Sequence, residues 1–259
     1  MSRAGHDRRA RRLTRTAAAL AAVGLAAAGV GGLALPATAT TDPVPDPAQT
    51  LVAHYTFDGD GDTVLQDTSG HGHNLLAVTS RGGAITPIAR ATGHALAFPT
   101  ACTVEPCPRI ALRAASTPDL NPGTQPLRFG ASIKLRHDQT SSGQNLVQKG
   151  YSAHSSQYKL QIDGLAGKPS CAMVDDAHPH IWLAKSSITV ADGRWHHLEC
   201  RRAGSTLTIL VDAVARGTRT IPATLSVTNP NPLCIGSKGA YLDNDQYHGI
   251  LSDVWISIG

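Results

Sequence analysis

Apolar and polar residues alternate with a period of two in several segments of the chain, and this alternation predicts short β-strands. Phe129, Ala131, Ile133 and Leu135 occupy every second position of one such segment. Successive side chains of a strand point to opposite faces of its sheet, so the pattern predicts one buried face and one more exposed face. The same alternation is present at residues 53–57, 158–162, 207–211 and 254–258.

Residues 190–212 contain the clearest pair of strands. A turn at Ala203-Gly204 separates two alternating runs, which is typical of a β-hairpin. Leu198 and Cys200 share one face of the first run, and we expect this face to pack against the core. The other face of that run carries Trp195, His197, Glu199 and Arg201.

Turn-forming residues separate the alternating runs, and the exported part of the chain has no convincing helical pattern. The 25 glycines and 16 prolines suit many short strands joined by tight turns. We therefore predict an all-β fold, an antiparallel jelly-roll sandwich of two sheets. Residues 51–259 show no shift in composition and are numerous enough for one domain with a sizeable core.

The first 39 residues predict a signal peptide. Six arginines precede a run of Ala, Gly, Leu and Val, and Ala37-Thr38-Ala39 offers small residues to a signal peptidase. A membrane anchor is the competing interpretation, but the Ala/Gly-rich run and Pro36 favour cleavage. The export route, Sec or twin-arginine, stays open. We expect the remaining chain to be secreted, with residues 40–50 as a proline-rich linker.

The charge of the exported chain argues against a nucleic-acid partner. The whole chain has a net charge of +4, but six of its 23 Lys and Arg and one of its 19 Asp and Glu lie in residues 1–39. The other residues contain 17 basic and 18 acidic side chains, a net charge of −1, without a basic patch. We expect no nucleic-acid partner and no membrane contact after cleavage of the signal.

All five cysteines follow the predicted signal peptide, in a part of the chain where disulfides persist after export. Cys102 and Cys107 enclose four residues and favour a local disulfide. Cys171 and Cys200 lie on predicted strands and are candidate cross-strand neighbours. Half of a zinc site at Cys102 and Cys107 is less favoured, because the other cysteines have no matching spacing. Cys234 is left without an assigned partner. It is either a buried free thiol or the true partner of a cysteine that is paired wrongly above.

A series of short motifs occurs in order along residues 51–259. They are LVAHYTFD (51–58), QDTSGHGHNL (66–75), ALAF (95–98), GASIKL (130–135), QNLVQKG (144–150), PLCIGSKG (232–239) and DNDQYHGILSDVWI (243–256). Together with the Trp195-His196 hairpin, they resemble the secreted bacterial laminin-G-like family of concanavalin A-like folds. The resemblance implies the jelly-roll sandwich. It also implies a Cys171–Cys200 disulfide, because in that family the cysteines flanking this strand often pair.

The resemblance implies a function as a non-catalytic module that binds carbohydrate, with an extracellular glycan or a surface protein as partner. Fold analogy alone is weak support for function. An extracellular polysaccharide-active enzyme with an unrecognised site and a structural or protein-interaction domain are the alternatives. The oligomeric state stays open.

The acidic residues do not form a recognisable catalytic motif. Only Glu105 and Glu199 follow residue 39, and neither belongs to the E-x-D-x-x-E strand of the glucanase relatives. A pair of carboxylates is what glycoside hydrolysis ordinarily requires. The chain also has no G-x-S-x-G nucleophile motif. We therefore do not expect an enzyme.

Calcium is the best-supported cofactor, with a structural role. In similar folds an acidic N-terminal turn and the C-terminal strand often hold the ion, which here corresponds to Asp67 and Asp253. Gly70 and Asn74 are further candidate oxygen ligands from the turn. An equally open interpretation is that Asp67 caps its own turn and that Asp253 is a solvent-facing strand residue.

Closely spaced histidines suggest a zinc site at first sight. Residues two apart on a strand share a face, so His71 and His73, or His178 and His180, have the spacing to chelate a metal. No Cys, His and Asp set completes a site at a known spacing. We therefore interpret these side chains as turn or surface histidines.

The aromatic residues bear on sugar binding, because carbohydrate modules stack sugars on exposed rings. The tryptophans are interpreted as filling the sandwich, although Trp255 lies in phase with Asp253 and opposite Val254 and Ile256. The candidate ligand-binding residues are Tyr151, Tyr241 and Tyr247.

Overall fold

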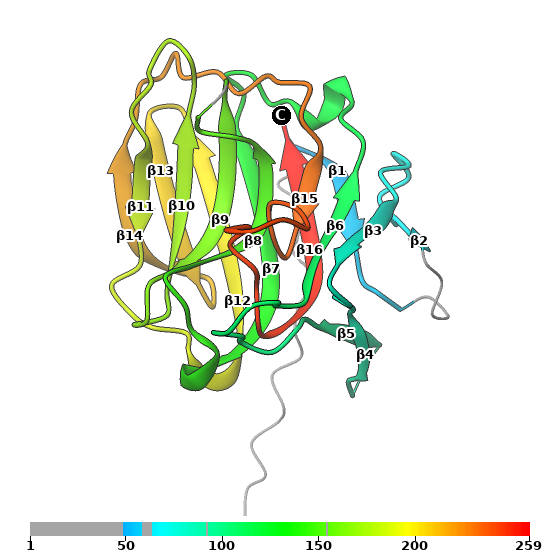
Figure 1. The fold of residues 1–259 in the computed structure, drawn as a ribbon. Coiled ribbons are helices and arrows are strands. Elements are labelled where there is room, and N and C mark those ends of the chain that lie inside the picture. The colour runs from blue at the N-terminus through cyan, green and yellow to red at the C-terminus, as the bar shows by residue number, and fades with distance from the viewer. Residues whose placement is uncertain (1–48, 59–63, 92, 154) are drawn as a thin grey trace, which may run out of the picture. The chain divides into compact units, whose positions relative to one another are not determined.

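Two antiparallel β-sheets, here called sheet I and sheet II, lie face to face in the protein (Figure 1). The computed structural model describes residues 49–58, 64–91, 93–153 and 155–259. The predicted signal peptide and all but the last two residues of the predicted linker lie outside the described residues. The described residues belong to one compact unit, Pro43–Gly259.

Sheet I contains the predicted hairpin and the C-terminal strand. Its spatial order is β14 (Val214–Thr220), β13 (Thr206–Val211), β12 (Asp192–Ala203), β7 (Leu127–Arg136), β16 (Ile250–Ile258), β5 (His94–Ala97) and β4 (Thr86–Ala89). β5 pairs with the start of β16, and β1 (Thr50–Tyr55) pairs with its end. The first and last strands of the domain are therefore neighbours.

Sheet II is built mainly from the middle of the chain. Its order is β11 (Trp182–Lys185), β10 (Lys168–Val174), β9 (Gln157–Asp163), β8 (Gly143–Gly150), β15 (Leu233–Ile235), β6 (Arg109–Ala114), β3 (Leu75–Ser80) and β2 (Val64–Leu65). In the part of the chain that the structure describes, the helical segments are the short 3-10 turns η1 (Pro118–Leu120) and η2 (His137–Gln139). The predicted all-β sandwich of two antiparallel sheets is confirmed. Among the described residues no helix has the length and apolar character to cross a bilayer.

The apolar positions of the predicted strands form the core. Phe129, Ala131, Ile133 and Leu135 are all fully buried on β7. Tyr158, Leu160 and Ile162 are buried in the same way on β9. Phe57 differs from the prediction, because it lies after the end of β1 with a left-handed φ of 62°, although its side chain is buried.

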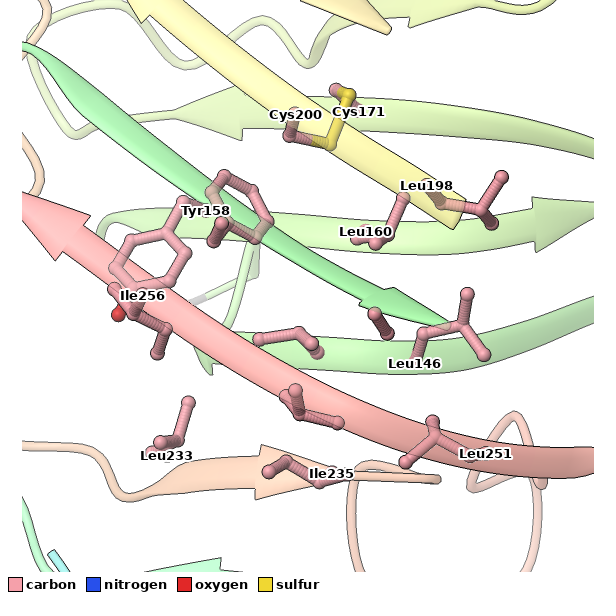
Figure 2. Packing of buried hydrophobic residues seen from close by; sticks show 14 of the residues in the cluster. Leu146, Tyr158, Leu160, Cys171, Leu198, Cys200, Leu233, Ile235, Leu251 and Ile256 are labelled. Carbon is pink, nitrogen blue, oxygen red and sulfur yellow. A yellow bond between two sulfur atoms is a disulfide. The ribbon is translucent and has the colours of Figure 1, made fainter. Parts of the chain in front are cut away.

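The inner faces of the two sheets meet in one apolar cluster. Figure 2 shows Leu146 and Leu160 of sheet II near Leu198, Leu251 and Ile256 of sheet I, where the strands of the two sheets cross. Each fully buried side chain of this size contributes about 1.5–3 kcal/mol to folding. The cluster is thus the main source of stability for the sandwich.

Both predicted disulfides are present. Cys102 and Cys107 close a short loop, and Cys171 on β10 is bonded to Cys200 on β12. The predicted cross-strand arrangement needs one correction, because β10 and β12 belong to different sheets. The Cys171–Cys200 bond crosses the core and joins the two layers (Figure 2). Cys234 is a buried free thiol, and burial raises its pKa.

The Cys171–Cys200 disulfide is predicted to contribute more stability than the Cys102–Cys107 disulfide. The chain-entropy model gives about 3–4 kcal/mol for the first loop, whose ends are 29 residues apart, and about 2 kcal/mol for the second, with a separation of 5. Cys171→Ala/Cys200→Ala and the matched Cys102→Ala/Cys107→Ala variant are compared by urea unfolding. Equal losses of unfolding free energy would contradict the prediction.

Trp255 lies on the outer face of sheet I, yet it is only 1% exposed. Its ring stacks on His197 at a centroid distance of 6.3 Å. Gly130 of β7 makes room for the indole, because a Cβ there would lie 3.0 Å from the ring and 2.4 Å from Leu198 O. The expected phase of Trp255, opposite Val254 and Ile256, is therefore correct, and the ring is buried against the sheet.

Glu199 lies on the same face and is paired with two arginines. Its Oε1 accepts hydrogen bonds from Arg128 Nε at 2.8 Å and from Arg201 Nε at 2.9 Å. Burial alone would raise the pKa of Glu199, but these hydrogen bonds and charges outweigh it and lower the pKa. Glu199 is thus a buried carboxylate that stabilises the sheet.

Glu199→Gln is predicted to lower the free energy of unfolding by about 1.5–3 kcal/mol at pH 7, the range for hydrogen bonds to charged groups. Because the folded-state pKa is lowered, this contribution is complete above the unfolded pKa of about 4.3 and is lost as pH falls through the folded pKa. Urea unfolding at a series of pH values should show a weaker acid dependence for the variant. Asp138→Asn, which removes an exposed ion pair with Arg136, is the control and should change little. Parallel pH curves for wild type and Glu199→Gln would count against this role.

Candidate functional site

A polar groove of about 220 Å³ lies on the outer face of sheet II. Its floor is formed by β8, β9 and β10, and its rim by the β8–β9 loop and by Lys238 and Ile181. The residues along it are Gln148, Tyr151, Ser152, Ala153, Gln157, Lys159, Gln161, Ala172, Val174, Ile181 and Lys238. The volume lies below the range of about 300–1,000 Å³ for pockets that enclose drug-sized ligands, so the groove suits shallow contact with part of a longer ligand.

The alternation of β9 places its polar residues in the groove. Lys159 lies between Gln148 of β8 and Ala172 of β10 in the strand register. Gln161 lies one row further along, beside Ser170. Because Tyr158, Leu160 and Ile162 point into the core, the residues between them must face outward.

Hydrogen bonds orient the amides on the floor. Asn145 Nδ2 donates to Gln148 Oε1 at 2.6 Å, and Gln148 Nε2 donates to Gly150 O at 2.7 Å. Gln161 Nε2 donates to Asp163 Oδ1 at 2.6 Å. Gln148 and Asn145 are buried, so the amide that this floor presents to a ligand is the partly exposed Gln161, held by Asp163.

Two lysines at the groove share one carboxylate. Asp245 Oδ2 lies 3.2 Å from Lys159 Nζ and 2.8 Å from Lys238 Nζ. Burial lowers the pKa of Lys159, and the charge of Asp245 opposes this only in part. The charge of Asp163 also acts on Lys159, so two carboxylates accompany the two ammonium groups at the groove.

Tyr151, one of the candidate ligand-binding residues, lies at the rim of the groove, and its role in binding stays a prediction. Gly150 precedes it with a φ of 84°, and a Cβ there would lie 2.0 Å from Ser156 O, so only glycine permits this close turn. The Tyr151 hydroxyl donates to Lys238 O at 3.2 Å. Burial raises the pKa of Tyr151 to about 12, so it is a neutral donor at pH 7.

The other two candidate tyrosines lie elsewhere. Tyr241 is 49% exposed and lines a separate hollow with Arg81 and Leu242. Tyr247 is fully buried, packs edge-on against Phe98 and donates its hydroxyl proton to Ile250 O at 3.2 Å. The structure therefore corrects the expectation for Tyr247, which is a core residue because the loop before β16 directs its ring into the apolar cluster, against Phe98. Of the three tyrosines, only Tyr151 lines the groove.

Of the predicted calcium ligands, Asp67, Gly70 and Asn74 lie in the 67–74 loop. Asp253 lies on β16, beside the end of β1. Asp67 Oδ1 accepts from the backbone N–H groups of His54 and Ser69, and Oδ2 from Ser69 Oγ and His73 N, each at 2.9 Å. Asn74 Oδ1 accepts from Asp67 N at 2.9 Å. Four hydrogen bonds use the acceptor capacity of the Asp67 carboxylate, so a calcium ion here would displace some of these donors.

Asp253, the other predicted carboxylate ligand, lies on β16 beside β1. It has a left-handed φ of 50° at an irregularity in the strand, and its Oδ1 lies 2.9 Å from His54 Nε2. Gly70, with a φ of 91°, allows the 67–74 loop to turn. The structure therefore brings Asp67 and Asp253 to the same residue, His54, and calcium binding by these residues stays a prediction.

If the protein binds a structural calcium ion, its melting temperature should rise with the calcium concentration. A ligand that binds only the folded state raises stability by about 2.7 kcal/mol at a hundredfold excess over its Kd, which moves the melting temperature by several degrees. Melting is measured in EDTA and in excess CaCl₂ by circular dichroism, with Asp253→Asn as the variant that should remove the difference. Equal melting temperatures of the wild type would argue against calcium.

The two glutamates do not face the groove. Glu105 is paired with Arg109, and Glu199 with Arg128 and Arg201. Their partners lower the pKa of both carboxyl groups, so neither has the raised pKa of a general acid.

The paired histidines have different partners. His178 Nδ1 lies 2.8 Å from Asp175 Oδ1, whereas His180 packs edge-on against Trp182. His71 and His73 both reach Asp119, which the sequence interpretation did not consider. His73 is also buried, contrary to the expectation of an exposed turn histidine.

The two crossed sheets and the groove on an outer face define a β-sandwich of the concanavalin A type. A sequence model of the concanavalin A-like lectin/glucanases superfamily matches residues 113–257, and the chain belongs to this superfamily. No curated protein matches the chain.

Solved structures with the same fold include a carbohydrate complex and toxin domains. Domain 4 of AbnA, an extracellular GH43 arabinanase from Geobacillus stearothermophilus, solved in complex with arabinotriose, is 17% identical, with a TM-score of 0.62 over 82% of this chain and 93% of that chain. The binding domain of Paraclostridial Mosquitocidal Protein 1 is 14% identical, with a TM-score of 0.60 over 80% and 48%. The binding domain of botulinum neurotoxin serotype D is 12% identical, with a TM-score of 0.56 over 80% and 47%. This chain spans about half the length of these two toxin domains, and at such identities the similarity concerns the fold.

Proposed function

We propose that this protein is a secreted, non-catalytic module that binds carbohydrate through the groove of β8, β9 and β10. The carrying observation is the combination of the oriented Gln161 amide, the paired lysines Lys159 and Lys238, and the Tyr151 ring on one surface. Amides offer both donors and acceptors to sugar hydroxyls, and a tyrosine ring offers an apolar face with a polar edge.

Secretion is supported by the two disulfides, which persist in oxidising compartments. It is also consistent with the predicted signal peptide in residues 1–39. The AbnA domain in complex with arabinotriose is a fold relative for which a sugar ligand is known, and it suggests an oligosaccharide as the first probe. An extracellular glycan is therefore the proposed partner, ahead of a surface protein.

Tyr151→Ala is predicted to weaken oligosaccharide binding about tenfold, equivalent to about 1.4 kcal/mol, because the ring contact at the rim is lost. Tyr151→Phe keeps the ring and removes only the hydroxyl that donates to Lys238 O, so it should bind nearly as well as wild type. A glycan array that includes arabinotriose identifies the ligand, and calorimetry measures the Kd. Equal weakening by both variants would exclude ring contact as the basis of binding.

Gln161→Ala is the corresponding test of the groove floor and should weaken binding of the same oligosaccharide about fivefold to tenfold through lost hydrogen bonds. Gln125→Ala, which changes an exposed glutamine outside the groove, is the matched control and should leave the Kd unchanged. An array without any bound glycan would favour a structural or protein-interaction role. Depolymerisation of a polysaccharide by the purified protein would favour an enzyme.

A further inference from the structure

Three metal-binding side chains from two separate segments meet at one point beside β3. His71 and His73 come from the loop between β2 and β3, and Asp119 comes from η1. Asp119 Oδ2 lies 3.0 Å from His71 Nδ1 and 2.9 Å from His73 Nε2. Among the described residues this is the one group of three His, Cys, Asp or Glu side chains whose ligand atoms all lie within 4.8 Å of one another.

The histidine loop is held in this conformation by residues outside the cluster. Asp67 Oδ2 accepts a hydrogen bond from His73 N at 2.9 Å, and Gly72 has a left-handed φ of 79° between the two histidines. The two imidazole rings are close to parallel, with an interplanar angle of 21°. Both rings are therefore directed at Asp119 by the backbone of the loop.

Thr117 links the cluster through a second set of hydrogen bonds. Its Oγ1 donates to Asp119 Oδ1 at 2.5 Å and lies 3.4 Å from His73 Nδ1. Asp119 Oδ2 lies within hydrogen-bond distance of one nitrogen of each histidine, while Thr117 holds the other oxygen of Asp119. The two rings and the carboxylate therefore converge on a single oxygen atom.

The two separations from the histidine nitrogens to Asp119 Oδ2 are close to those of a zinc site. With Zn–N of about 2.0–2.1 Å and Zn–O of about 2.0–2.2 Å, two ligand atoms of a tetrahedral site are about 3.3 Å apart. The two observed separations, 3.0 and 2.9 Å, need to lengthen by only a few tenths of an ångström. Imidazole nitrogens favour zinc and similar transition metals over calcium, which takes oxygen ligands.

We propose that His71 Nδ1, His73 Nε2 and Asp119 Oδ2 bind one Zn²⁺ ion. Thr117 is a positioning residue, because it donates to the second oxygen of Asp119 and lies 3.4 Å from the far nitrogen of His73, as outer partners of zinc ligands do. The side chains of His71 and Asp119 are 34% and 36% exposed, whereas that of His73 is 3% exposed. The fourth coordination position therefore faces solvent and takes a water molecule.

Calorimetric titration of the full, tag-free protein with ZnCl₂, after treatment with EDTA, tests this site. Wild type is expected to bind one zinc per chain and to release protons on binding. His71→Ala and Asp119→Asn are expected to weaken zinc binding by more than a hundredfold, and Thr117→Val by about tenfold to a hundredfold. His71 and Asp119 are partly exposed, so circular dichroism should show these variants folded.

His196→Ala is the matched control. His196 also contacts two aspartates, Asp192 and Asp212, but through opposite nitrogens of its ring, so it does not form a chelating set. Its substitution should leave the zinc affinity unchanged. Equal loss of affinity in His196→Ala and His71→Ala would overturn the proposal, as would a wild type that binds no zinc or that binds only CaCl₂.

Cobalt titration of the wild type provides a measurement that does not depend on folding of the variants. Co²⁺ in a tetrahedral site with nitrogen and oxygen ligands absorbs visible light far more strongly than octahedral Co²⁺. The expected result is a band that appears at one equivalent of CoCl₂ and disappears on addition of ZnCl₂. Absence of a band at one equivalent contradicts the tetrahedral site.

Discussion

The apolar layer between the two sheets determines where every other feature of the domain lies. Side chains of one strand alternate between the layer and the outer surface, so burial of Leu160 and Ile162 requires Gln161 to face outward. Core and groove are therefore the two faces of the same strand. A shift of β9 by one residue would exchange them, and the hydrophobic cost of exposing the core side chains prevents this exchange.

The parts of the groove are held in different ways. Its floor belongs to central strands of sheet II. These strands are held in place by the apolar core and by the Cys171–Cys200 bond to sheet I (Figure 2). Its rim, with Tyr151 and Lys238, belongs to loops. A rigid floor with a rim of loops is a common design for binding sites, because loops can change residue by residue without loss of the core. Specificity in this domain is expected to lie in the rim.

The carboxylate of Asp67 holds the 67–74 loop in its conformation. Asp67 accepts hydrogen bonds from β1 and from its own loop, and so ties the loop to the first strand. β1 pairs with β16, so the same interaction connects the loop to the last strand of the domain. His71 and His73 are presented to Asp119 as a result of this arrangement.

The local pattern of the sequence was sufficient for the alternating strands that it named, for the hairpin and for the burial of the apolar residues of β7 and β9. It did not predict that Ser132 and Lys159, on the opposite faces of these strands, are buried as well. The predicted features follow from the period of the side chains, which depends only on neighbours in the chain. The sequence also identified Cys171 and Cys200 as a pair, through a family resemblance, but not that their strands lie in different sheets. Sheet membership depends on which distant segments pair, and the alternation is the same in either sheet.

The tyrosines and histidines illustrate the same limit. Tyr151 and Tyr247 both lie in sequence contexts typical of loops, yet one lines the groove and the other fills the core. Asp119 lies 46 residues after His73, in a segment without any metal-binding motif, and only the packing of η1 against the 67–74 loop brings them together. The sequence by itself determined which face of each strand is buried, because alternation is local. Which loops meet, and so where a ligand or metal can bind, was decided by the tertiary structure, because these contacts join residues far apart in the chain.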